Sequence, residues 1–196
     1  MKEHSVISDP VLHAKEKYQE NFFTAETVLP WQAYASFCTT GQFAGHKRHC
    51  GPTAMTNLVL TLRPELEAGP VFDEIVSIGR RHLAYLNVNN LGGTSDGLSG
   101  VYLRAVLKRY GLSDATVRFS GVATEKHLRQ ALNKGNLCYL QMHFHPKYHN
   151  HHVLVYASEW KGFRTADGWK HTPTYLNERD VRGATFFAIT PPPSEK

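Results

Sequence analysis

Two different periodicities of apolar residues divide this chain, and the change between them limits the folds that it can adopt. Residues 53–110 carry apolar side chains at helical spacing, with Gly and Pro at the breaks. From residue 116 onward, short runs rich in β-branched and aromatic residues alternate with turn residues. Helices in the first half and turn-linked strands in the second half predict an α+β fold with an antiparallel sheet.

Breaks in this pattern set the bounds of the expected elements. We expect a turn at Gly69-Pro70 and a loop over residues 91–96, in which Thr94 or Ser95 would cap the following helix. The expected helices cover residues 9–23, 50–62, 72–85, 99–110 and 124–133. The expected strands cover residues 116–119, 137–144, 151–158, 162–166 and 184–190.

The size and composition of the chain fit a single globular domain. Its 196 residues, of which 41% are hydrophobic and 20% are charged, are enough to bury a substantial core. We expect one domain over residues 1–196, with a core over about 31–190, an N-terminal extension over 1–30 and a tail over 191–196.

The charges and the apolar runs exclude several classes of partner. The net charge of +5 comes from Lys and Arg residues that are scattered along the sequence, so we expect no nucleic-acid partner. The first residues lack the apolar run of a secretion signal, and no apolar run approaches the ~18 residues of a membrane span. A cytoplasmic protein without a membrane partner is expected. Nothing in the sequence indicates the oligomeric state.

Cys50 is the most distinctive of the three cysteines. Together with Cys38 and Cys138 it shows no CxxC spacing, so reduced thiols are expected in place of a disulfide framework or a four-cysteine zinc site. Gly51 permits a sharp turn after Cys50, and Pro52 suits a first helical turn. Cys50 is therefore expected at the positive end of a helix, where the pKa of a thiol, ~8.5 when free, falls by several units. A buried, inert cysteine is the alternative.

Five histidines fall between residues 143 and 152, and one of them is a candidate base for Cys50. A cysteine nucleophile needs a histidine that takes its proton and a third group that orients this histidine. Strand alternation places His151 and His152 on opposite faces, so only one of them can face Cys50. Asp167 follows His151 by 167 − 151 = 16 residues, an interval that a hairpin spans. The simpler explanation of Asp167 is a residue of an Asp-Gly turn.

Three motifs of the sequence resemble those of the papain-like cysteine peptidases, most closely the bacterial group related to the peptidases that process bacteriocin leaders. The likeness spans about residues 40–190. It depends on a Cys-Gly-Pro-Thr-Ala helix start, an Asn-His-hydrophobic strand and an Asp at the end of the next strand, which are residues 50–54, 150–157 and 165–169. The resemblance implies a papain-like fold, in which a helix that begins with the nucleophile packs on an antiparallel sheet that carries the catalytic His and Asp.

The resemblance also implies a role for each candidate site residue. Cys50 would be the nucleophile, His151 the general base and acid, and Asp167 the residue that orients His151. Gln42, upstream of Cys50, would donate a hydrogen bond to the oxyanion. The implied activity is that of a peptidase or amidase that forms a thioester with a peptide or amide substrate, without a cofactor or metal. Acyl transfer of the transglutaminase type on the same triad is an alternative.

The histidines leave two other classes of function open. His143 and His145 share a strand face, and His46 or His49 could join them to bind a metal ion. The histidines could instead line the rim of a cleft or lie exposed, in a domain that keeps the fold without catalysis. A histidine-rich, mildly basic cleft would favour acidic substrates.

Overall fold

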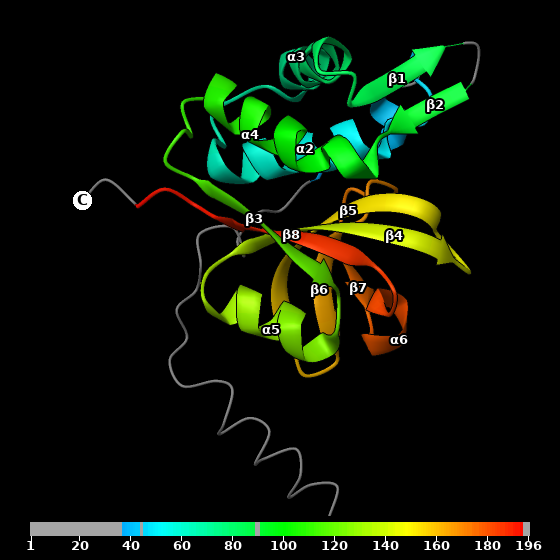
Figure 1. Cartoon of the computed structure of the whole chain (residues 1–196), viewed down its shortest axis with the longest axis vertical. Helices are drawn as coiled ribbons and strands as arrows, with labels where there is room; N and C mark the ends of the chain where they lie inside the picture. Colours follow the sequence, from blue (N-terminus) through cyan, green and yellow to red (C-terminus); the bar gives the residue numbers. More distant parts are fainter. Residues whose placement is uncertain (1–36, 44, 89–90, 194–196) are drawn as a thin grey trace, which may run out of the picture.

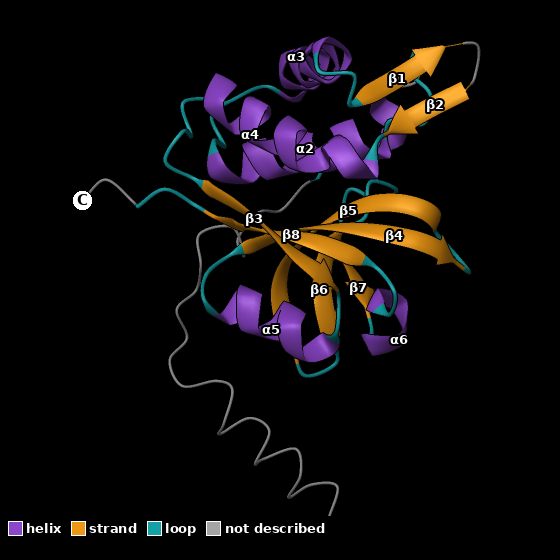
Figure 2. Ribbon diagram, in the orientation of Figure 1, coloured by secondary structure: helices purple, strands orange, loops and turns teal. Residues whose placement is uncertain are grey.

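A computed structural model of the chain describes residues 37–43, 45–88 and 91–193. A layer of helices lies on one face of a six-stranded sheet, and two further helices lie on the opposite face (Figures 1 and 2). The helix expected over residues 9–23 and the whole of the N-terminal extension expected over 1–30 lie outside the described residues. Helices and an antiparallel sheet in the expected order confirm the α+β prediction.

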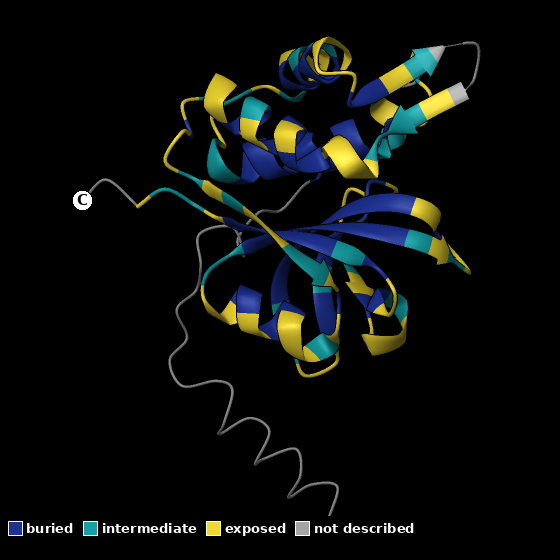
Figure 3. Cartoon of the chain, in the orientation of Figure 1, coloured by how far each residue is buried: buried dark blue, intermediate teal, exposed yellow. Residues whose placement is uncertain are grey.

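The central helix of the helical layer begins at the candidate nucleophile. It is α2, Cys50–Leu62, and it is buried from Gly51 to Thr61, as the dark blue centre of Figure 3 shows. A helix that is enclosed on all sides needs apolar or internally bonded residues on every face. Its threonines meet this need, since the hydroxyl groups of Thr56 and Thr61 donate to the carbonyl oxygens of Pro52 and Asn57.

Two further helices complete this layer, and one of them begins earlier than expected. These helices are α3, Ala68–Arg81, and α4, Ser99–Arg109. The turn predicted at Gly69-Pro70 is wrong, because both residues lie in the first turn of α3, where a proline needs no N–H partner. The predicted end of this helix at Tyr85 is also wrong, since α3 stops at Arg81.

A β-hairpin follows α3 where the sequence predicted the end of a helix and a loop. Its strands are β1, Tyr85–Val88, and β2, Leu91–Thr94, with Tyr85 opposite Thr94. A Cβ at Gly92 would overlap the carbonyl oxygen of Leu86, so the close approach of the two strands requires a glycine. A short 3-10 helix, η3, Asp96–Leu98, then precedes α4, so neither Thr94 nor Ser95 caps α4 as predicted.

The second half of the chain forms the antiparallel sheet. The strand order is β3-β8-β4-β5-β6-β7, and every neighbouring pair is antiparallel. The strands are β3, Thr116–Val122; β4, Leu137–His145; β5, His149–Glu159; β6, Gly162–Ala166; β7, Thr174–Leu176; and β8, Thr185–Thr190. The helices of the opposite face are α5, Glu125–Asn133, and α6, Glu178–Val181. Neither β7 nor α6 was predicted, because both are too short to show a period.

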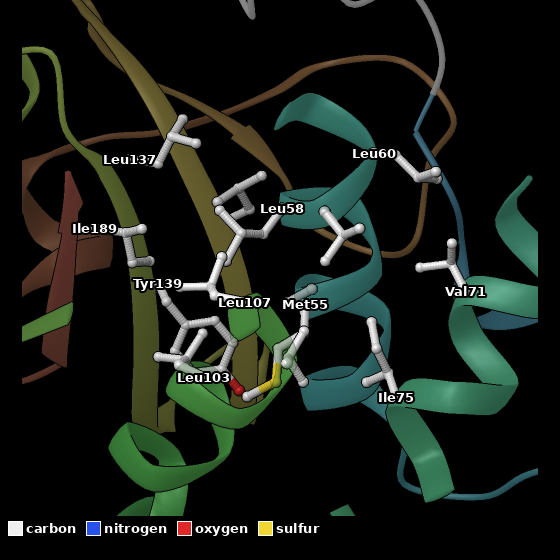
Figure 4. Packing of buried hydrophobic residues seen from close by; sticks show 14 of the residues in the cluster. Met55, Leu58, Leu60, Val71, Ile75, Leu103, Leu107, Leu137, Tyr139 and Ile189 are labelled. Carbon is white, nitrogen blue, oxygen red and sulfur yellow. The ribbon is translucent and has the colours of Figure 1, made fainter. Parts of the chain in front are cut away.

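Two apolar clusters lie on the two faces of the sheet. Leu154 and Tyr156 of β5 belong to the cluster that contains Met55 and Leu58 of α2, part of which Figure 4 shows. Val153 and Val155 belong to the other cluster, with Leu128 of α5 and Val181 of α6. The predicted alternation along β5 is therefore confirmed. Among the described residues, no helix combines the length and the apolar character that crossing a membrane requires.

Candidate active site

Cys50 is the first residue of α2, as the sequence predicted, and its thiol is only partly accessible. Burial raises the pKa of the Cys50 thiol, and this effect exceeds the opposing effect of three main-chain N–H groups, those of His152, Gly51 and Cys50. The nearby Asp96 carboxylate raises the pKa further. The predicted fall of the thiol pKa is thus wrong, because loss of solvation outweighs the helix N-terminus.

Gly51 allows the β-hairpin to pack directly against the start of α2. A Cβ at this position would overlap the side-chain oxygen of Thr94 at the end of β2. That Thr94 oxygen is buried and has no hydrogen-bond partner among the described residues. The glycine after the nucleophile is therefore required for packing, in addition to its part in the turn.

His151 lies at the start of β5 and touches the segment after β6. Its Nε2 donates a hydrogen bond of 2.6 Å to the main-chain oxygen of Asp167. The ring is parallel to the Tyr148 ring at 5.5 Å and lies 5.1 Å from the Trp169 ring. Burial lowers the pKa of His151, while the main-chain oxygen and the charge of Asp167 act in the opposite direction.

The carboxylate of Asp167 is bonded within its own turn and to a tyrosine. One oxygen accepts from the main-chain N–H groups of Trp169 and Lys170 at 2.9 and 3.1 Å, and the other accepts from the Tyr148 hydroxyl at 3.3 Å. Asp167 therefore acts as a turn residue and also contacts His151, but it makes this contact through its main chain and not through its carboxylate.

His152 lies on the face of β5 that packs against α2. Its Nδ1 accepts from the Tyr139 hydroxyl at 2.8 Å, and its Nε2 lies 3.3 Å from a carboxylate oxygen of Asp96. Burial lowers the pKa of His152 to about 3. Both ring nitrogens thus have partners, and the imidazole is held neutral.

The structure brings Cys50 and the two histidines to the same end of the sheet without joining their side chains. No hydrogen bond links the Cys50 sulfur to either imidazole among the described residues. The cross-strand partner of His151 is Met142, which belongs to the cluster on the far side of the sheet from α2. The role of His151 as the base stays a prediction.

Gln42 lies in a 3-10 turn, η2, Thr40–Phe43, next to the Asp167 segment. The main-chain N–H of Thr40 donates to the carbonyl oxygen of Gly168 at 2.7 Å, which fixes this turn beside the site. The Gln42 side chain is exposed, and its oxygen accepts from the main-chain N–H of Thr39 at 2.8 Å. Within the described part of the chain, no hydrogen bond joins the Gln42 amide to Cys50.

The remaining histidines are distributed over separate contacts. His143 lies 3.5 Å from Asp96, His145 lies 3.3 Å from Asp180, and His49 bonds the Thr53 hydroxyl at 3.0 Å. Within residues 37–43, 45–88 and 91–193, no three His, Cys, Asp or Glu side chains are grouped so that they could hold a metal ion.

Three residues of this region were missed in the sequence. Asp96 contacts His152, Tyr139 contacts the same ring from β4, and Tyr148 contacts both His151 and Asp167. Tyr148 carried one weak signal, its place three residues before His151. Nothing in the sequence marked Asp96 or Tyr139.

Comparisons with known proteins found similarity only among solved structures. No protein-family model matches the chain, and no curated protein matches it. A double glycine motif protease from an AMS/PCAT transporter, in complex with the leader peptide, is 13% identical, with 81% of this chain and 94% of that chain covered and a TM-score of 0.48. The peptidase domain of Streptococcus ComA, a bifunctional ABC transporter of a quorum-sensing pathway, is 14% identical, with 80% and 98% covered and a TM-score of 0.49.

Both neighbours are peptidases of transporters. They belong to the group of peptidases that the sequence motifs resemble. At this level of identity and superposition, the roles of individual residues depend on the geometry described above.

Proposed function

We propose that this chain is a papain-like cysteine peptidase or amidase in which the Cys50 sulfur attacks the carbonyl carbon of a peptide or amide bond. The observation that carries the proposal is the position of Cys50 at the start of α2, where the N–H groups of Gly51, Cys50 and His152 favour its thiolate. Donors arranged in this way stabilise negative charge as it develops on sulfur or on a carbonyl oxygen.

His151 is the better of the two candidate bases. A base needs a free nitrogen, and both nitrogens of His152 are engaged by Tyr139 and Asp96. His151 uses Nε2 for Asp167, and its Nδ1 has no hydrogen-bond partner among the described residues. In this proposal Nδ1 receives the Cys50 proton when substrate binding brings the imidazole to the sulfur.

The directions of the two pKa shifts indicate how the proton moves. Burial raises the pKa of Cys50 and lowers the pKa of His151, so the resting pair is a neutral thiol and a neutral imidazole. His151 accepts the proton as sulfur attacks, and then donates it to the leaving amine nitrogen. The product is a thioester on Cys50, which water hydrolyses to a carboxylic acid and the free thiol.

Asp167 and Gln42 keep the roles that the resemblance implies, with changes of detail. The main-chain oxygen of Asp167 fixes the orientation of His151, and its carboxylate stabilises the imidazolium that forms. Gln42 uses its side-chain oxygen for the bond to Thr39, so its amide nitrogen would be the donor to an oxyanion. The main-chain N–H of Cys50 is the principal donor in the proposal.

An assay with p-nitrophenyl acetate and iodoacetamide tests the proposal without a known substrate. We expect hydrolysis of the ester, an acetyl adduct on Cys50 detected by mass spectrometry, and faster carbamidomethylation of Cys50 than of Cys38 or Cys138. These two thiols are internal controls, because burial raises the pKa of both.

Substitutions separate the catalytic residues from the rest. Cys50→Ala should abolish acetylation, and His151→Ala should lower the rate roughly 100-fold. The proposal fails if all three thiols react slowly and alike, or if His152→Phe removes turnover while His151→Ala does not. A digest of a peptide library by the full chain, compared with Cys50→Ala, then identifies the bonds that are cleaved.

A further inference from the structure

Asp96 joins the helical layer to the sheet beside Cys50. One oxygen of its carboxylate lies 3.1 Å from Nε2 of Gln141 and 3.3 Å from Nε2 of His152, and the other lies 3.5 Å from Nδ1 of His143. Its side chain is nevertheless 49% exposed. A half-exposed carboxylate that meets three side chains of β4 and β5 is fixed in direction, because each partner comes from the rigid sheet.

The imidazole of His152 is held from two sides as a result. The Tyr139 hydroxyl donates to Nδ1, so the proton of the neutral ring is on Nε2, which donates to Asp96. Tyr139 and His152 are both buried. A ring with two fixed hydrogen bonds holds its own main chain in place, and the main-chain N–H of this residue is one of the donors to the Cys50 sulfur.

We propose that Asp96 is a positioning residue of the Cys50 site, which acts through His152: the carboxylate and the Tyr139 hydroxyl fix the His152 ring, and the fixed ring keeps the His152 main-chain N–H directed at the sulfur. The inference depends on the proposed function in one respect, that Cys50 is the nucleophile. It gives His152 a role in the site although this residue does not act as the base.

The charge and the geometry of Asp96 have opposite effects on Cys50. The negative charge of Asp96 disfavours the Cys50 thiolate, whereas the main-chain N–H of His152, which Asp96 helps to fix, favours it. The other titratable groups that interact with the thiol are Tyr85 of β1 and Tyr139 of β4, and His143 and His152 of the sheet face the Asp96 carboxylate. Asp96 is thus the one carboxylate among the groups that the described residues bring to Cys50.

Two substitutions separate these effects. Asp96→Asn keeps an oxygen that accepts from His152 and removes the charge, so kcat for p-nitrophenyl acetate should stay within about threefold. The pH profile of Cys50 carbamidomethylation should move to lower pH by about 0.5 unit, because a thiolate no longer faces a negative charge. Asp96→Ala removes the acceptor as well, so kcat should fall on the order of tenfold with KM within about twofold.

Glu74→Gln is the matched control, because Glu74 pairs with Arg81 and Arg109 on the outer surface of α3 and α4. It should change neither the rate nor the pH profile. The inference is overturned if Asp96→Asn and Asp96→Ala behave alike, or if Asp96→Ala raises KM with kcat unchanged, which would make Asp96 a contact of the substrate. If the unsubstituted chain neither forms an acetyl adduct nor alkylates Cys50 selectively, the proposed function fails instead.

Discussion

Nε2 of His151 donates to the main-chain oxygen of Asp167 over 2.6 Å, and the carboxylate of Asp167 points away into its own turn. A residue that orients a histidine through its main-chain oxygen tolerates substitution better than a residue that orients it through a side-chain carboxylate. The oxygen acceptor survives any change of side chain that keeps the turn. The charge of the carboxylate is a separate contribution, and it favours the protonated imidazole.

Asp167→Asn should therefore reduce kcat only about two- to tenfold, since an amide oxygen can still accept from Trp169 and Lys170. Loss of the negative charge lowers the pKa of His151 further. Because the base must be neutral, activity rises with pH through this pKa, and the acidic limb of kcat/KM should move to lower pH. Asp167→Ala also loses the hydrogen bonds that hold the turn, so its kcat should be lower than that of Asp167→Asn. An unchanged acidic limb in Asp167→Asn would contradict this assignment.

Tyr148 supports the same pair from the hairpin between β4 and β5. Its ring is stacked on His151, and its hydroxyl donates to the Asp167 carboxylate. Tyr148→Phe keeps the stacking and loses the hydrogen bond, so the free energy of unfolding should fall by about 1 kcal/mol and kcat a few-fold. Tyr175→Phe is the control, because the Tyr175 hydroxyl contacts Arg164 at a remote edge. Urea denaturation measures the free energy of unfolding, and p-nitrophenyl acetate hydrolysis measures kcat. If Tyr148→Phe and Tyr175→Phe change both quantities equally, Tyr148 does not support the pair of His151 and Asp167.

Gly51 is predicted to tolerate no side chain. Gly51→Ala forces a methyl group against Thr94, which should lower the free energy of unfolding by roughly 1–3 kcal/mol and displace the Cys50 turn. Gly69→Ala is the matched control, since a Cβ at residue 69 meets nothing within 4 Å. Residue 69 lies in the first turn of α3, where alanine has a higher helix propensity than glycine. Thermal unfolding of the two variants checks the difference. Equal melting temperatures would show that the hairpin can move away from α2.

The long elements were predictable because each repeats a period over several turns or strand residues. The start of α2 at Cys50, the bounds of β6 at Gly162–Ala166 and the alternation along β5 follow from local pattern alone. The hairpin β1–β2 was missed because Gly92 and Gly93 are usual loop residues, and their place in a strand is decided by the approach of Leu86.

Motifs in the sequence select candidate site residues, but they do not determine the contacts among these residues. Cys50, His151 and Asp167 were selected by motif, but the bond from His151 to a main-chain oxygen depends on the turn that follows β6. Asp96 and His152 are far apart in sequence and meet only when the helical layer is seated on the sheet. The direction of the Cys50 pKa shift has the same origin, because burial is a property of the whole fold and a helix N-terminus is a local one.

The buried histidines predict how stability depends on pH. Burial lowers the pKa of His49, His151 and His152, the last to about 3, so the unfolded chain binds more protons than the folded chain between pH 6.5 and the folded pKa values. Stability is therefore complete above pH 6.5 and is lost as the pH falls. Each such histidine contributes up to about 1.4 kcal/mol per pH unit in this interval, and His151 contributes less because the Asp167 carboxylate opposes the fall of its pKa.

Urea denaturation at pH 7 and at pH 5 measures this loss. His152→Phe fills a similar volume without a titrating group, so its free energy of unfolding should change less between the two pH values than that of the unsubstituted chain. His82→Gln is the control, because His82 is exposed after α3 and its substitution should leave the pH dependence as it is. If the unsubstituted chain is equally stable at both pH values, burial does not hold these imidazoles neutral. The hydrogen bonds assigned to His152, in which Nδ1 accepts from Tyr139 and Nε2 donates to Asp96, would then be wrong, because they require a neutral ring.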